Sequence, residues 1–450
     1  MSNNVKTIMG IAAASVKTVS GIAAASVKTV MNEALVLIKD IATITSYAAV
    51  EQSGSATTDG QYGVNMSYDE DNNFVYVQYA LSGGGGGAVV GEFNSSNNDV
   101  DFGAEQTIES SNAFSGNSCD YDKYNNRIWS AWIGGSGNQL FARCGQINSN
   151  KTITWGTRLT VQEGADSTSN YNQGLLQQGL AVDQSTGKCL IVWNSAADNI
   201  SGASNHHPTG VILTVDTSDN SITAGSQARM ATGGSGQSFP SIKCHYDPDN
   251  TEWVAVTDAN GSSTGIYALR ITNSSGTPAP ANQTQLGSNT AHHLQGDGTG
   301  DHNASKSAVG GRYGGLWFVY DTSSVPKLFA FENTGSAINW DTGGQQVSHG
   351  TAISQSGRGG TMAFSHARGR FATHGNTGSA DNLEIFSYDG TNFTTHNDSS
   401  LITIVSDDDG FYRGGASMQD MSAFADGAVM IVGTDYDSRD PKYIIIEMGG

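Results

Sequence analysis

From residue 42 onward, short apolar runs alternate with segments rich in Asp, Asn and Gly, and this pattern repeats along the chain. In each copy, an apolar run is followed by a short turn and then by a second, more strongly apolar run. The second runs begin at residues 74, 128, 189, 252, 316, 370 and 429. Apolar runs of this length, separated by turn residues, predict β-strands that are joined in hairpins.

A third apolar run follows each pair, as in Leu140–Cys144 and Tyr443–Ile446, and a fourth follows in some copies, as in Ile153–Val161. Hairpin-connected strands with a repeat of about 60 residues are typical of β-propellers, in which each four-stranded blade packs only on its neighbours. The seven copies therefore predict an all-β fold, a seven-bladed β-propeller over residues 41–450.

The last copy reaches Gly450 directly after its third run, so its fourth strand has to come from another part of the chain. Residues 43–50 read Thr-Ile-Thr-Ser-Tyr-Ala-Ala-Val and parallel Ile153–Val161, the fourth strand of the second copy. We expect strand 43–50 to complete the seventh blade and to close the ring without an exposed join.

A different repeat occupies residues 1–40, where Gly10–Val19 recurs as Gly21–Val30 and lysines recur every 11 residues. Eleven residues fit three helical turns, so equivalent positions stay on one face. The pattern predicts an amphipathic α-helical arm, either one helix or several that break at the glycines, which becomes ordered through its contacts. Its apolar attachment face would be formed by Val5, Ile8, Val16, Val19, Val27 and Val30.

Charge distinguishes the two regions. The chain has 22 Lys and Arg against 42 Asp and Glu, a net charge of −20, whereas the first 40 residues carry four lysines against Glu33 and Asp40. The arm is thus net +2 and the remainder net −22. An acidic body without basic patches is not expected to bind nucleic acid. No apolar run approaches the roughly 20 residues that span a bilayer, so no membrane association is expected.

Four cysteines lie in or beside apolar runs, without CxxC pairs: Cys119, Cys144, Cys189 and Cys244. We expect them to be buried free thiols in a protein that folds in a reducing cytoplasm. The tryptophans of the second runs, Trp129, Trp132, Trp193, Trp253 and Trp317, are expected to pack in the blade core rather than to bind sugar.

One segment gathers residues that could bind a metal ion: His292, His293, Asp297, Asp301 and His302. Such side chains could hold Zn²⁺ or another transition metal, although a Gly-rich surface loop without metal explains them as well. Residues 406–410 could bind Ca²⁺ or form a solvated turn. Asp69–Asn73 lacks the later Gly and Glu of a calcium loop, and its recurrence at each hairpin indicates a turn.

Catalytic motifs are missing: the chain contains no GxSxG, HExxH, phosphate-binding loop or Cys/His nucleophile pattern. Propellers do include glycosidases, whose paired carboxylates come from different blades and leave no linear spacing. The Ser-x-Asp-x-Gly-x-Thr-Trp turn of sialidases is absent. The sequence therefore predicts neither an enzyme nor a cofactor.

Two sets of motifs resemble a known family. Ala14–Val19 and Ala25–Val30 both read Ala-Ser-Val-Lys-Thr-Val, which resembles the short N-terminal repeats of virion proteins from tailed bacteriophages, especially marine ones. The body resembles the Tyr-Asp and Phe-Gly repeats that often follow in such proteins, on the residues Tyr68-Asp69, Tyr121-Asp122, Tyr246-Asp247, Phe102-Gly103 and Trp155-Gly156. The resemblance covers nearly the whole chain.

This resemblance implies a structural protein of the virion, made in the host cytoplasm. It would be a tail fibre, a spike or a capsid-associated fibre, homo-oligomeric and anchored to other tail or capsid proteins by its arm. The propeller would then either adsorb to a host-surface glycan or protein or serve as a purely structural tail or capsid decoration subunit. A carbohydrate-binding or glycosidase propeller is a third, less favoured interpretation.

Overall fold

The computed structural model describes most of the strands and the turns between them. The described residues are 7–8, 11–12, 18–19, 22–23, 43–49, 64–81, 84–97, 99–110, 114–134, 139–162, 179–195, 207–230, 242–259, 265–286, 293–294, 314–320, 326–340, 345–346, 361–365, 370–376, 380–388, 392–396, 402–406, 420–424, 428–434 and 441–447. Within them every regular element is a β-strand, and there is no helix long and apolar enough to cross a bilayer.

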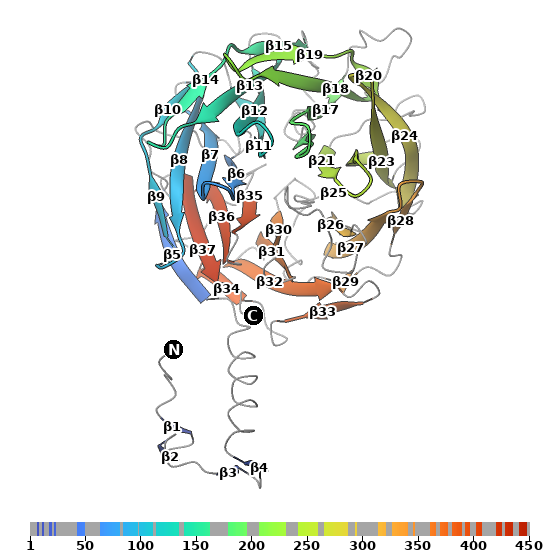
Figure 1. Ribbon diagram of the computed structural model, residues 1–450. Helices are drawn as coiled ribbons and strands as arrows, with labels where there is room; N and C mark the ends of the chain where they lie inside the picture. The colour runs from blue at the N-terminus through green and yellow to red at the C-terminus, as the bar shows by residue number, and fades with distance from the viewer. Residues whose placement is uncertain are drawn as a thin grey trace.

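Seven sheets of four or five strands surround a common axis (Figure 1). We number them in chain order. Sheet 1 contains β6 (Val64–Asp69), β7 (Phe74–Ala80), β8 (Gly86–Asn94), β9 (Asp99–Phe102) and β10 (Gln106–Glu109). Sheet 2 contains β11 (Ser115–Asp122), β12 (Arg127–Gly134), β13 (Gln139–Ile147), β14 (Ile153–Trp155) and β15 (Leu159–Gln162). Sheet 3 contains β16 (Gly179–Val182), β17 (Cys189–Ser195), β18 (His207–Asp216), β19 (Ser221–Ala224) and β20 (Ala228–Arg229).

The remaining sheets follow the same order. Sheet 4 contains β21 (Ile242–Asp247), β22 (Glu252–Ala259), β23 (Gly265–Ser274) and β24 (Thr277–Leu286). Sheet 5 contains β25 (His293–Leu294), β26 (Gly314–Tyr320), β27 (Pro326–Asn333), β28 (Ile338–Trp340) and β29 (Gln345–Gln346). Sheet 6 contains β30 (Thr361–Ser365), β31 (Arg370–Asn376), β32 (Ala380–Tyr388), β33 (Phe393–Thr395) and β34 (Ile402–Ser406). Sheet 7 contains β35 (Asp420–Ala423), β36 (Ala428–Thr434), β37 (Pro441–Glu447) and β5 (Thr43–Ala49).

The sheets share one topology, since each is an antiparallel meander whose first strand lies toward the axis. The hairpin register also repeats: Asp69 pairs with Phe74, Asp122 with Arg127 and Asp247 with Glu252. This arrangement confirms the all-β propeller prediction. It places successive copies of the sequence repeat in equivalent positions around the axis.

The core lies between the sheets rather than inside one sheet. The second strands are the most thoroughly enclosed, because every residue of β7 and β12 is buried. Apolar side chains of neighbouring sheets form shared clusters, for example Trp129 of sheet 2 with Ile191 and Trp193 of sheet 3. The prediction that tryptophans pack in the core is confirmed for Trp129, Trp132, Trp193 and Trp253. All four cysteines are buried and free, as predicted.

Sheet 7 joins the two ends of the propeller. Strand β5 pairs antiparallel with β37, with Thr43 opposite Glu447 and Ala49 opposite Lys442. Sheet 7 in turn packs on sheet 1, where the Tyr443 hydroxyl donates to Asp99 Oδ1 at 2.7 Å. Aromatic rings add to this contact, because Phe93 stacks on Phe424 with ring centroids 3.9 Å apart.

In the N-terminal arm the helix prediction is wrong at the residues that the structure describes. These form two small antiparallel pairs, β1 (Thr7–Ile8) with β2 (Ile11–Ala12) and β3 (Thr18–Val19) with β4 (Ile22–Ala23). The two strands of each pair are separated in sequence by two residues, Met9-Gly10 in the first pair and Ser20-Gly21 in the second. Glycine in a two-residue connection favours a hairpin. At the described residues, equivalent positions of the 11-residue repeat thus lie in equivalent antiparallel pairs.

The predicted attachment face divides accordingly. Ile8 lies in β1 and Val19 in β3, where only the backbone is described. Val5, Val16, Val27 and Val30 lie outside the described residues. A helical attachment face is therefore not supported at the two positions that can be compared.

Candidate functional site

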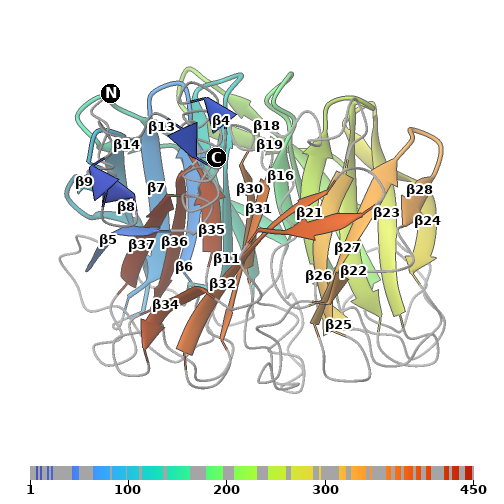
Figure 2. The same ribbon diagram turned by 90° about the horizontal axis from the view of Figure 1, so that it is seen from below.

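The propeller has two faces of different construction, at the two ends of its strands (Figure 2). In sheet 2, the turn after Asp122 and the turn after Ile147 lie at one end, and Gly134 pairs with Gln139 at the other end. We call the first end the turn face. It carries the short turns between first and second strands and between third and fourth strands, at residues 70–73, 95–98, 123–126, 148–152, 184–188, 217–220, 248–251, 275–276 and 334–337.

The opposite end, the loop face, carries the connections between second and third strands and between successive sheets. The strand ends that flank residues 163–178, 196–206, 231–241 and 287–292 all lie there. These connections are longer than the turns of the turn face. In sheets 1 to 4 the longer connections are therefore concentrated on one face of the ring.

The arm joins the propeller on the turn face. Ala428, which follows the turn between β35 and β36, pairs with Glu447, and Glu447 pairs with Thr43. Strand β5 thus begins at the turn face and ends beside Lys442 at the loop face. Because the arm immediately precedes Thr43, it leaves the ring on the side opposite the long connections.

An aspartate closes the hairpin between the first and second strands in sheets 1 to 4: Asp69, Asp122, Asp183 and Asp247. Asp69 Oδ1 accepts from the backbone N–H groups of Asp71 and Asn72 at 3.0 and 3.1 Å, and its Oδ2 accepts from the Asn72 amide at 2.8 Å. Asp247 makes the same three contacts with Asp249 and Asn250. These carboxylate oxygens are thus used within the turn, which confirms the prediction of a turn rather than a calcium loop.

The turn aspartates are also buried. Burial raises the pKa of Asp69, Asp122 and Asp247 above the ordinary value of 3.8, although hydrogen bonds from the turn act in the opposite direction. Tyr121 of sheet 2 lies near enough to Asp69 of sheet 1 to lower the pKa of that carboxyl, and its backbone N–H donates to Ser67 Oγ at 3.0 Å, so the two sheets are tied together beside the turn. Burial and the neighbouring Asp183 of sheet 3 raise the pKa of Tyr246 of sheet 4.

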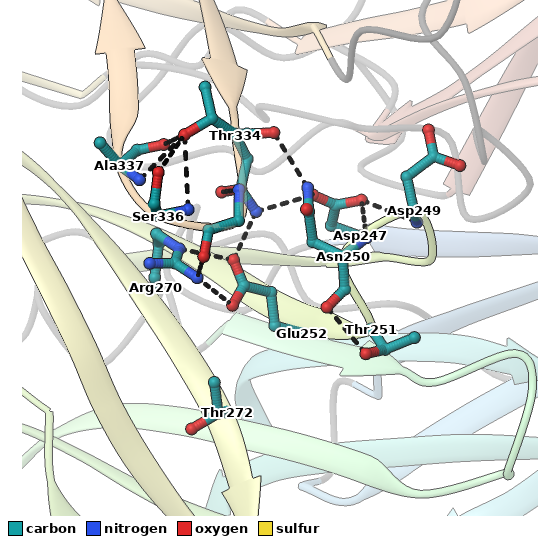
Figure 3. A network of polar contacts seen from close by, with 12 residues as sticks. Asp247, Asp249, Asn250, Thr251, Glu252, Arg270, Thr272, Thr334, Ser336 and Ala337 are labelled. Atoms are coloured by element: carbon teal, nitrogen blue, oxygen red, sulfur yellow. Dashed lines mark hydrogen bonds and ion pairs between the residues drawn. The ribbon is translucent and has the colours of Figure 1, made fainter.

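A buried polar network joins sheets 4 and 5 at this face (Figure 3). The Arg270 guanidinium donates to both oxygens of Glu252, at 2.6 and 2.7 Å, and also to the carbonyl of Gly335. The Asn333 amide donates to Glu252 at 2.6 Å and to Asp247 at 2.7 Å. A turn of sheet 5 is thereby fastened to a turn of sheet 4.

Sheets 2 and 3 are fastened by different residues in the same place. Arg127 Nε donates to Asn220 Oδ1 at 2.5 Å, and Asn220 Nδ2 donates to the Thr154 carbonyl at 2.8 Å. Between sheets 1 and 2, Lys151 Nζ pairs with Asp101 at 2.5 Å. The outer turn of one sheet is therefore held by the preceding sheet at three interfaces.

A second polar group lies nearer the loop face, between sheets 1 and 2. Asn117 Oδ1 accepts from Asn65 Nδ2 at 2.7 Å and from Gln78 Nε2 at 3.1 Å, and Gln78 accepts from Ser130 at 2.7 Å. The group consists of amides, the Ser130 hydroxyl and the Tyr76 phenol, which donates to Gln78 Oε1 at 2.9 Å, and all of them are buried. Burial raises the pKa of Tyr76 well above its ordinary value. Such groups fix the position of neighbouring strands but do not transfer protons at neutral pH.

The predicted metal ligands are not brought together in the described part of the chain. His293 lies in β25 and pairs with Tyr320, whereas His292, Asp297, Asp301 and His302 lie outside the described residues. Among the residues that the structure describes, no group of three or more His, Cys, Asp or Glu side chains could hold a metal ion. In the 406–410 segment only Ser406, the last residue of β34, is described.

Two neighbouring residues on the turn face, Lys123 and Tyr124, belong to no motif of the sequence. Lys123 Nζ bridges from sheet 2 to Glu70 and Asp71 of sheet 1, at 2.5 and 3.4 Å. Beside it, Tyr124 is the exposed large hydrophobic side chain of the described residues, with 63% of its surface accessible. Only its place in the turn, after the Tyr-Asp pair, marks it in the sequence.

No family model and no curated protein matches the chain. Among solved structures, a protein from Lactobacillus plantarum has a TM-score of 0.50 and 10% sequence identity, over 79% of this chain and 88% of that one. An ulvan lyase of a new polysaccharide lyase family has a TM-score of 0.49 and 11% identity, over 90% and 97%. The Cps50 (Swd1) β-propeller domain of Myceliophteria thermophila has a TM-score of 0.47 and 9% identity, over 89% and 99%. The arrangement of the sheets identifies the fold as a β-propeller, and at these identities the likenesses concern the fold alone.

Proposed function

We propose that this protein is a structural appendage of a tailed-bacteriophage virion, with a closed seven-bladed propeller carried on an N-terminal arm. The observation that carries the proposal is the register of β5, because it attaches the arm to the turn face and leaves the long connections on the far side. A module anchored at one face and variable at the other suits attachment and display. The seven sheets and their pairing through β5 support the closed ring.

The arm is the proposed anchor to other tail or capsid proteins. Its sequence carries the virion-type repeats and a net charge of +2, whereas the propeller is strongly acidic. Two-stranded pairs as short as β1–β2 and β3–β4 are not stable alone, so the arm is expected to become ordered in an assembly. Repeats of this kind also suit association with other copies of the chain, and we propose a homo-oligomer.

The propeller is proposed to act without catalysis, cofactor or metal. The carboxylates of Asp69, Asp247 and Glu252 are engaged in turn and inter-sheet contacts. The group around Asn117 consists of amides, a serine hydroxyl and the Tyr76 phenol, whose pKa is raised well above its ordinary value by burial. The loop face is the proposed contact surface for a host glycan or protein. A purely structural tail or capsid decoration is the alternative, in which the same face contacts only other virion proteins.

Particle composition tests the virion assignment. Phage particles are purified from cells that carry either the full chain or a chain lacking residues 1–38, and the protein is then quantified by mass spectrometry. We expect the full chain in intact particles and its loss in the arm deletion. Absence of the full chain from purified particles would contradict the proposal.

Adsorption separates the two roles of the propeller. The purified protein is added to host cells before infection, together with a denatured sample as control. Binding to cells and a reduced rate of infection are expected if the loop face contacts the host. Failure to bind, with the protein still present in particles, would leave the structural role.

A further inference from the structure

Strand β5 links the arm to the propeller. It is the fourth strand of sheet 7, and its N-terminal end continues directly into the arm. Any force that the arm carries therefore enters the propeller at Thr43. The remaining strands of sheet 7 come from the opposite end of the chain.

The direction of β5 decides how it responds to that force. Six residue pairs join it to β37, from Thr43–Glu447 at the turn face to Ala49–Lys442 at the loop face. The hydrogen bonds of an antiparallel pair lie perpendicular to the strands. A pull on the arm away from the turn face acts along β5 and loads all of these bonds together, whereas a sideways pull opens them one after another from Thr43.

The partner strand β37 is also held by strands and side chains other than β5. β37 is hydrogen-bonded on its other edge to β36, and Ile444, Ile445 and Ile446 are buried. Tyr443 also fastens β37 to sheet 1 through Asp99 and through Phe102, whose ring lies 5.5 Å from that of Tyr443. A pull on the arm therefore loads the β5–β37 pairing directly, while β37 stays fastened to the rest of the propeller.

We infer that β5 is a mechanical latch, which holds the ring closed against tension along the arm because its pairing with β37 is loaded in shear. The latch releases readily when the arm is pulled across the turn face. This inference goes beyond the proposed function and does not depend on what the arm binds.

Single-molecule pulling on the full chain tests the latch. One handle is attached at the N-terminus, and the other at an azide-bearing residue placed at Ser110 or, in the matched protein, at Ser96. Both serines are exposed and belong to sheet 1, but Ser110 follows β10 at the loop face and Ser96 lies in the turn after β8. We expect the first rupture of the propeller to need a severalfold higher force with the Ser110 handle. Equal forces in the two geometries would overturn the inference.

A cross-link identifies the strand that breaks. Ala49→Cys and Lys442→Cys place thiols at directly opposed positions, whose Cα separation in an antiparallel pair falls within the range of a disulfide. With the Ser110 handle, the oxidised protein should lose the first rupture, and reduction should restore it. Persistence of that rupture in the oxidised protein would show that β5 is not the strand released. Virion incorporation is measured separately, so the proposed function and the latch can fail independently.

Discussion

Gly156 of sheet 2 lies directly against Asn220 of sheet 3, so closely that a Cβ atom at position 156 would stand 1.9 Å from the Asn220 carbonyl oxygen. The same approach recurs between Gly225 and the Gly276 carbonyl, at 2.1 Å, and between Gly103 and Lys151. Each of these glycines follows a fourth strand, and each neighbour lies in the outer turn of the next sheet. Glycine is required there because the backbone of one sheet packs against the backbone of the next.

Gly156→Ala should destabilise the propeller, since the added methyl group has no space and the two sheets must move apart. Forced overpacking of this kind typically costs about 1–3 kcal/mol. Urea unfolding monitored by tryptophan fluorescence measures the change. Ser226→Ala, an exposed position beside Gly225, is the control and should leave the midpoint unchanged. A Gly156→Ala protein as stable as the wild type would show that the turn adapts freely.

Arg270→Met should be strongly destabilising, because it leaves the buried Glu252 carboxylate without its cation. Removal of one partner of a buried pair typically costs about 3–5 kcal/mol. The control is Lys123→Met, which breaks the exposed pair with Glu70 and should cost about 0–1 kcal/mol. Thermal unfolding of the two variants compares them. Similar losses in both would mean that the sheet 4–sheet 5 network is not a principal fastening.

Stability should rise as the pH is lowered from neutral toward the ordinary aspartate value of 3.8. Burial raises the folded-state pKa of Asp69, Asp122 and Asp247, so each of them binds a proton more readily in the folded protein. Their contribution is complete below the ordinary value of 3.8 and is lost as the pH rises through the folded-state pKa. Urea midpoints at several pH values measure the slope.

The pH slope can be assigned to a residue by substitution. Asp122→Asn removes one of the three buried titrating groups and should flatten the dependence, whatever its effect on absolute stability. Asp216→Asn is the control, because hydrogen bonds from Ser218 lower the pKa of that exposed carboxyl. An unaltered slope in the Asp122 variant would assign the dependence to the overall negative charge instead.

Truncation tests the closing strand. Deletion of residues 1–38 keeps β5 and should leave the melting temperature of the propeller nearly unchanged. Deletion of residues 1–50 removes β5 and exposes the edge of β37, so it should lower the melting temperature and promote aggregation. Circular dichroism and size-exclusion chromatography compare the two proteins. If both deletions behave alike, the ring does not depend on β5.

Features that repeat within one sheet could be predicted from the sequence. The second strands are buried on both faces and so appear as continuous apolar runs, as in Phe74–Ala80 and Arg127–Gly134. The Asp turns could be recognised because the side chain bonds to backbone two and three residues ahead. Local contacts of this kind leave a pattern at fixed spacing.

Contacts between sheets left no such pattern. Arg127 donates a hydrogen bond to Asn220, and Arg270 and Asn333 both donate to Glu252. The number of residues between the contacting positions differs from one interface to the next. The aromatic-glycine pairs were visible as a repeat, but their purpose depends on a turn in the following copy. At the described residues of the arm the sequence pattern is ambiguous for another reason. An 11-residue period fits three helical turns and also fits two short antiparallel strands, with Gly10 and Gly21 between them.

The separation of the two faces also bears on how such a protein can change over generations. Substitutions on the turn face disturb fastenings that each involve two sheets, so that side is expected to be held nearly constant. Insertions, deletions and exchanges among the connections of the loop face leave those fastenings untouched. One lineage could therefore acquire new binding preferences on the proposed contact surface, the loop face, while it keeps the same turn face, the same arm and the same ring.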